Sequence, residues 1–105
     1  MKRTKRRYLA LQLDSDGTPT SKEFTDAIWN AITKLYGEYG ASQTGLALIK
    51  YDEGEKKAVI RTALATVNIV RTALASITRV ADKEAAVQVM AVSGTLKALH
   101  EKIRQ

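Results

Sequence analysis

The hydrophobic pattern of this chain changes its period several times, and the order of the changes limits the possible folds more than any other feature. Apolar residues alternate or run together in four short segments, which predicts strands at 6–13, 45–51, 56–63 and 85–92. Apolar residues three and four positions apart predict helices at 20–37 and 66–77, and a closing helix after 93–95. The 105 residues should therefore form one α+β domain in the order βαββαβα.

This order is the split βαβ arrangement of ferredoxin-like and RNA-recognition-motif (RRM-like) domains, with an added C-terminal helix. The first helix has the clearest boundaries, because Thr20 and Glu23 have the spacing of a capping box and Gly37 or Gly40 can end the helix. A polar turn with a glycine at 52–55 predicts a β-hairpin. We expect four antiparallel strands with one face under the first two helices.

The second face of that sheet should determine how the domain binds other molecules. RNA-recognition motifs place aromatic residues on the first and third strands, where bases stack on them. Here the third strand has none and the first has only Tyr8, so stacking is not expected to drive binding. The run 85–92 is apolar at nearly every position, which predicts that this strand is covered on both faces. The C-terminal helix can cover part of the second face, and a partner protein the rest.

Basic residues are concentrated at the N-terminus. The net charge is +6, and residues 1–7, the basic arm, contain Lys2, Arg3, Lys5, Arg6 and Arg7. Such a cluster attracts polyphosphate through long-range fields and counterion release. The chain has no cysteine, and it shows neither a signal peptide nor an apolar run near the ~20 residues that cross a bilayer. We expect a cytoplasmic protein with a polyanionic partner and no membrane association.

Motifs for catalysis and for metal binding are incomplete. Residues 40–45 have the glycine spacing of a phosphate loop, but Leu46 and Ala47 stand where its Lys and Ser/Thr belong. The acidic turn at 14–17 lacks the closing glutamate of a calcium loop. His100 is the single histidine and has no partner fixed by spacing. We therefore predict no catalytic residue, no metal ligand and no cofactor bound by this chain.

A second candidate site for anions lies before the closing helix. Ser93, Gly94 and Thr95 introduce the helix, and Lys97 lies in its first turn. Backbone amides at a helix N-terminus attract phosphate. The alternative is a plain helix cap, which the motif taken alone favours.

Several segments, taken together and in order, resemble a known family. They are RYLAL at 7–11, YGEYGAS at 36–42 leading to GLALIKYD at 45–52, VRTAL at 70–74 and VSGTLKAL at 92–99. The combination resembles protein component 2 of archaeal and eukaryotic ribonuclease P, and the resemblance covers most of the chain.

The resemblance implies a non-catalytic subunit of ribonuclease P, in which the RNA removes the 5′ leader of precursor tRNA and holds the Mg²⁺ ions. It also implies pairing with protein component 3 and self-association of component 2 within a heterotetramer. The residues expected to contact ribonuclease P RNA or precursor tRNA are Lys2, Arg3, Lys5, Arg6, Arg7, Ser93, Gly94 and Lys97, with Lys56, Lys57 and Arg61 as further candidates.

Two alternatives stay open. A stand-alone RRM-like module would bind oligonucleotides as a monomer, although the missing aromatic residues speak against it. A ferredoxin-like regulatory domain would bind a small ligand and dimerise through its sheet, but that function leaves the basic arm unexplained.

Overall fold

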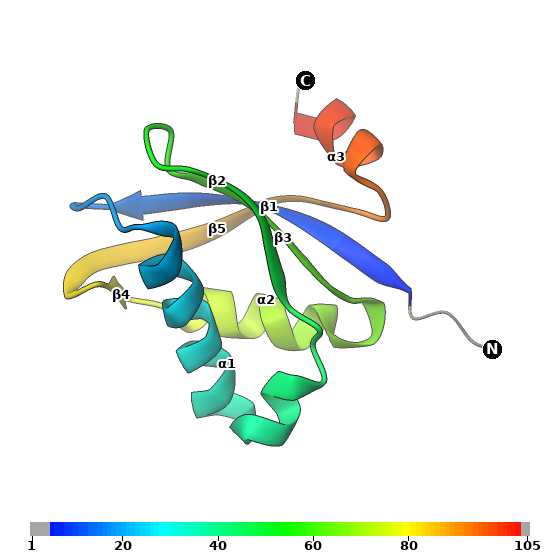
Figure 1. Ribbon diagram of the computed structural model, residues 1–105, viewed down its shortest axis with the longest axis horizontal. Helices are drawn as coiled ribbons and strands as arrows, with labels where there is room; N and C mark the ends of the chain where they lie inside the picture. Colours follow the sequence, from blue (N-terminus) through cyan, green and yellow to red (C-terminus); the bar gives the residue numbers. More distant parts are fainter. Residues whose placement is uncertain (1–4, 104–105) are drawn as a thin grey trace.

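The computed structural model describes residues 5–103 and has a sheet with helices on both sides. Its elements are β1 (Arg6–Ser15), α1 (Ser21–Ser42), β2 (Ala47–Asp52), β3 (Lys57–Ala63), the 3₁₀ turn η1 (Leu64–Thr66), α2 (Val67–Ser76), β4 (Arg79–Val80), β5 (Lys83–Ser93) and α3 (Leu96–Ile103). The antiparallel sheet has the order β2-β3-β1-β5-β4. Helices α1 and α2 lie on one side of it and α3 on the other (Figure 1). The predicted ferredoxin-like α+β fold with an added C-terminal helix is confirmed.

The core lies between the sheet and the first two helices. The central strand β1 directs Leu9, Leu11 and Leu13 into it, because alternate side chains of a strand point to one face. The largest contributions from the helices are those of Phe24, Ile28 and Ile32 in α1, and Val70 and Leu74 in α2. All of these side chains are at most 2% exposed. The opposite face of the sheet, called the outer face below, carries α3.

Helix α1 begins as predicted and has a break at Gly37. The amide of Glu23 donates to Thr20 Oγ1 over 3.2 Å and the amide of Thr20 donates to Glu23 Oε1 over 2.9 Å, which forms the capping box. Gly37 breaks the helix with φ 77° and ψ 172°, a conformation that is nearly restricted to glycine. The prediction that Gly37 ends the helix is confirmed for the first helical segment, but a second short helical segment, which was not predicted, follows it to Ser42. Burial of Ala41 in the core favours this last turn.

Strand β4 was not expected from the sequence. Its residues Arg79 and Val80 pair with Glu84 and Lys83 across a two-residue turn. In this turn Ala81 and Asp82 have positive φ values of 51° and 66°, as the tight hairpin turn requires. Asn-Gly is the usual sequence for such a turn, so an Ala-Asp pair gave no recognisable signal.

Within this chain, the strand over 85–92 is covered on one face only, and the predicted cover by a partner protein stays a prediction. Val87, Val89 and Val92 pack against the core, whereas Gln88 and Met90 on the outer face are exposed. Helix α3 spans only eight residues and buries Leu99 against the middle of the outer face, at Ala10 and Val59. The expectation that the C-terminal helix covers part of this face is confirmed, and most of β5 lies beyond its reach.

Candidate nucleic-acid interface

The described part of the basic arm continues the sheet. Lys2 and Arg3 lie outside the described residues. Arg6 and Arg7 belong to β1, where they pair with Ala63 and Thr62 of β3. The carbonyl of Lys5 accepts a hydrogen bond of 2.8 Å from the amide of Leu64. The backbone of residues 5–7 is therefore fixed by pairing, and the side chains of Lys5 and Arg6 are exposed.

Arg7 lies beside the turn that leads into α3. A Cβ atom placed on Gly94 would be 3.3 Å from Arg7 Nη1 and 3.7 Å from its Cζ. The guanidinium group thus packs against the bare backbone of Gly94, and Nη1 also donates to the carbonyl of Arg6 over 3.0 Å. The two candidate sites, more than eighty positions apart in sequence, meet at one edge of the molecule.

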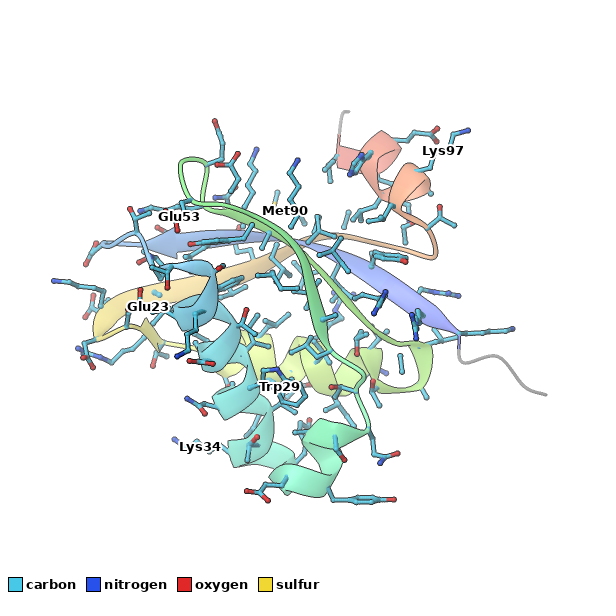
Figure 2. All side chains as sticks on the ribbon, in the orientation of Figure 1. Glu23, Trp29, Lys34, Glu53, Met90 and Lys97 are labelled. Atoms are coloured by element: carbon cyan, nitrogen blue, oxygen red, sulfur yellow. The ribbon has the colours of Figure 1, made fainter. Side chains whose placement is uncertain are left out.

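The start of α3 differs in detail from the expectation. Ser93 is the last residue of β5, lies opposite Tyr8 and is buried. Thr95 caps the helix instead, because its Oγ1 accepts a hydrogen bond of 3.1 Å from the amide of Ala98. Gly94 and Lys97 are exposed, and Lys97 extends from α3 into solvent (Figure 2). We use the name basic edge for Lys5, Arg6, Arg7, Gly94 and Lys97.

The three further candidates on β3 and the preceding turn do not act as one group. Lys56 has a positive φ of 56°, and its Nζ donates to the carbonyl of Ser15 over 2.6 Å, which joins the hairpin to the end of β1. Lys57 and Arg61 point to the outer face, since they lie opposite Gln12 and Tyr8. The Nε atom of Arg61 is buried and has no hydrogen-bond partner among residues 5–103.

Sequence reasoning missed two cations, Lys50 of β2 and Lys102 of α3. Together with Lys57 and His100 they line a groove of about 420 Å³ on the outer face. Lys50 could have been found from the strand pattern, because it pairs with Val59 of the outer face. Lys102 could not, because the position of α3 over the sheet is a tertiary feature.

No constellation for catalysis or metal binding appears between residues 5 and 103. Within that range no group of three or more His, Cys, Asp or Glu side chains could hold a metal ion, and no helix is long and apolar enough to cross a membrane. Burial raises the pKa of Tyr51 above 10.0, with smaller contributions from Glu53 and Glu23. Its hydroxyl donates to the carbonyl of Pro19 over 2.6 Å and its ring stacks on Phe24, which indicates a structural role.

Comparisons with known proteins agree with the order of elements and with the resemblance. Residues 7–104 match the family model described as the Rpp14/Pop5 family. A relative from Pyrococcus furiosus, "Ribonuclease P protein component 2", is 34% identical over 100 residues, which are 95% of this chain and 83% of the relative. The protein of the same name from Methanosarcina mazei is 30% identical over 103 residues, covering 98% and 87% of the two chains.

The fold itself occurs in a solved structure. A chain in the cryo-EM structure of yeast ribonuclease MRP superposes with a TM-score of 0.74 at 15% sequence identity, and the match covers 100% of this chain and 95% of that one. At this identity the match concerns the fold alone. The family model and the relatives together show that the chain belongs to the Rpp14/Pop5 family.

Proposed function

We propose that this chain is a non-catalytic protein subunit of ribonuclease P, and that it assists the catalytic RNA in removing the 5′ leader of precursor tRNA. The observation that carries the proposal is family membership, since two relatives named "Ribonuclease P protein component 2" match 95% and 98% of the chain at 34% and 30% identity. In this function the RNA supplies the reaction and holds the Mg²⁺ ions, and the protein binds no cofactor of its own.

The basic edge is the proposed contact with RNA. It combines the exposed cations Lys5 and Arg6 and the half-buried Arg7 with Lys97 and the N-terminus of α3, so that charges and backbone amides can bind one polyanion. The pairing of β1 with β5, with Tyr8 opposite Ser93, keeps the two parts together, and Arg7 lies beside Gly94. Ribonuclease P RNA and precursor tRNA both present phosphates, which this arrangement can bind without reading sequence.

A protein partner is the second part of the proposal. We propose pairing with protein component 3 and self-association within a heterotetramer, as in the family. Large apolar side chains on the last turns of α1 support a protein contact: Leu35, Tyr36 and Tyr39 are 47%, 39% and 80% exposed, and they surround the break at Gly37. We also propose a cytoplasmic location. The chain has no cysteine, which suits a reducing compartment, and tRNA processing is the proposed function.

The structure does not support the stand-alone RRM-like alternative. Its base-stacking platform would need accessible aromatic residues on β1 and β3. Tyr8, the one aromatic residue available there, packs against the cluster that Leu99 forms with Ala10 and Val59.

The test is cleavage of precursor tRNA by the cognate catalytic RNA together with component 3, with and without this chain. We expect this chain to raise the cleavage rate at limiting Mg²⁺, and no effect would contradict the proposal. The double variant Arg6→Gln/Arg7→Gln should stimulate less than the matched control Lys22→Gln/Lys34→Gln on α1. Substitution is preferable to deletion of the arm, because the backbone of Arg6 and Arg7 pairs with β3.

A further inference from the structure

We propose that the groove on the outer face, between α3 and the β2–β3 hairpin, binds a single-stranded segment of RNA through its phosphates. The inference rests on the proposed function and adds to it a binding site apart from the basic edge. It is argued from the shape of the groove, from its charge and from a line of cations that connects it with the basic edge.

The groove has an apolar floor and polar walls. Ala10 and Val59 form part of its floor under α3, and the side chains of Met90 and Ile103 border it. Met90 is 58% exposed and Ile103 47%. Figure 2 shows Met90 on the side of the sheet that carries α3. Such a surface can accept ribose and base faces without selecting a sequence, because contacts with the faces of the bases do not read their hydrogen-bonding edges.

The charge of the groove is positive. Lys50 comes from β2, Lys57 from β3 and Lys102 from α3, and among residues 5–103 Asp52 is the one carboxylate that lines the groove. Lys102 is held in place by a hydrogen bond of 2.6 Å from its Nζ to the carbonyl of Val92. Three cations from three elements around one carboxylate attract an anion that is long enough to contact all of them.

A line of cations extends the groove toward the basic edge. Lys57 and Arg61 lie on the outer face of β3. Arg6 of β1 is the next cation along this line, because it pairs with Ala63 at the end of β3. Positions 57 to 63 of β3 span about 20 Å at the rise of an extended strand. The side chain of Arg61 on this line is half-buried, and among residues 5–103 its buried Nε donor has no hydrogen-bond partner. Continuity over this length favours an extended polyanion, such as a nucleic-acid strand, over a short acidic peptide.

The first experiment measures binding of the full chain to a fluorescent oligouridylate of ten nucleotides at several salt concentrations. The triple variant Lys50→Gln/Lys57→Gln/Lys102→Gln should bind about tenfold more weakly or worse, and the slope of log K against log salt should fall by about 2. The matched control Lys22→Gln/Lys34→Gln/Arg71→Gln removes the same charge from exposed positions of α1 and α2 and should bind within about twofold of the wild type. An equal loss in both variants, or none in the first, overturns the inference.

The change at Lys102 removes a hydrogen bond to Val92, so unfolding of each variant is recorded in parallel. If the triple variant is destabilised, the double variant Lys50→Gln/Lys57→Gln replaces it, with Lys22→Gln/Lys34→Gln as its control. A normal affinity in that double variant overturns the inference.

The second experiment locates the bound RNA. The chain contains no cysteine, so Met90→Cys introduces a single thiol in the groove and Ala75→Cys one on the exposed side of α2. Oligouridylate should slow alkylation of the thiol at position 90 and leave that at position 75 unchanged. Equal rates with and without RNA at position 90 overturn the inference. A deca-glutamate peptide is tested in the same way. If the peptide protects the thiol at position 90 and oligouridylate does not, the inference is overturned in favour of an acidic protein segment.

Failure of this inference can be told apart from failure of the proposed function. If the groove variants bind oligouridylate normally while the wild-type chain still stimulates cleavage of precursor tRNA, the inference is wrong and the function stands. If the wild-type chain does not stimulate cleavage, the function is wrong, whatever the groove binds.

Discussion

At the scale of single residues, three buried threonine hydroxyls connect the segment after α1 to the sheet. Thr44 and Thr62 are fully buried and Thr66 nearly so. Thr62 Oγ1 donates to the carbonyl of Thr44 over 2.8 Å and lies 3.1 Å from Thr66 Oγ1. Thr44 Oγ1 in turn donates to the carbonyl of Ala41 over 2.8 Å. These bonds satisfy polar groups that burial would otherwise leave unpaired.

Thr62→Val keeps the shape of this side chain and removes its hydrogen bonds. We expect the free energy of unfolding to fall by about 1–3 kcal/mol, because the hydroxyl of Thr66 and the carbonyl of Thr44 each lose a partner in a buried place. Urea denaturation measures the change. The control Thr72→Val lies at an exposed position of α2 and should change stability by less than about 0.5 kcal/mol. Equal effects of the two substitutions would contradict a role for the buried network.

Tyr51 gives the protein a pH dependence at alkaline pH. Burial, and then Glu53 and Glu23, raise its pKa in the folded state above 10.0. Since the unfolded chain loses this proton more easily, the contribution to stability is complete below pH 10 and is lost as the pH rises through the raised pKa. Unfolding midpoints measured from pH 9 to 11.5 should fall more steeply for the wild type than for Tyr51→Phe. Parallel curves would show that other groups cause the alkaline loss.

At the scale of elements, the break in α1 depends on one residue. Nothing lies within 4 Å of a Cβ placed on Gly37, but its φ of 77° with ψ of 172° is strained for any residue with a side chain. Gly37→Ala should therefore destabilise the protein by about 1–3 kcal/mol through the backbone alone. The control Gly54→Ala, in the β2–β3 turn without positive φ, should cost less. Thermal unfolding compares the two, and an unaffected Gly37→Ala would mean that the break tolerates a side chain.

The elements also show what can be predicted from a sequence and what cannot. Local signals sufficed where the deciding contacts are local, as in the capping box of Thr20 and Glu23. They failed for the last turn of α1, which depends on burial of Ala41, and for the turn at Ala81 and Asp82, whose residue types are unusual there. The apolar run 85–92 indicated burial on both faces. Small and flexible apolar residues are also compatible with exposure, and Ala86 and Met90 are exposed.

The same distinction applies to the candidate site. The charge of the arm was visible in the sequence, and so was the anion-binding potential of the segment before α3. Their meeting through Arg7 and Gly94 was not visible, because it depends on β1 and β5 being neighbours in the sheet. For the same reason the groove that contains Lys50 and Lys102 could be recognised only in three dimensions.

At the scale of the whole molecule, the two sides of the sheet have different surfaces. The side under α1 and α2 contains the core (Figure 1), and the last turns of α1 expose the apolar residues around Gly37. The outer face and the adjoining edge present cations from β1, β2, β3 and α3. This separation would allow the proposed protein partner and RNA to bind at the same time without competing for one surface.

The separation predicts a specific effect on the electrostatics of RNA binding. Lys5→Gln/Arg6→Gln/Arg7→Gln removes three charges from the basic edge and keeps the backbone pairing of β1 with β3. If each cation neutralises one phosphate, the slope of log K against log salt for ribonuclease P RNA should fall by about 2 to 3. Binding of the chain to component 3 should be unchanged, because the apolar surface on α1 is not altered. Filter binding at four salt concentrations measures the slope, and an unchanged slope would place the phosphate contacts of the complex away from this edge.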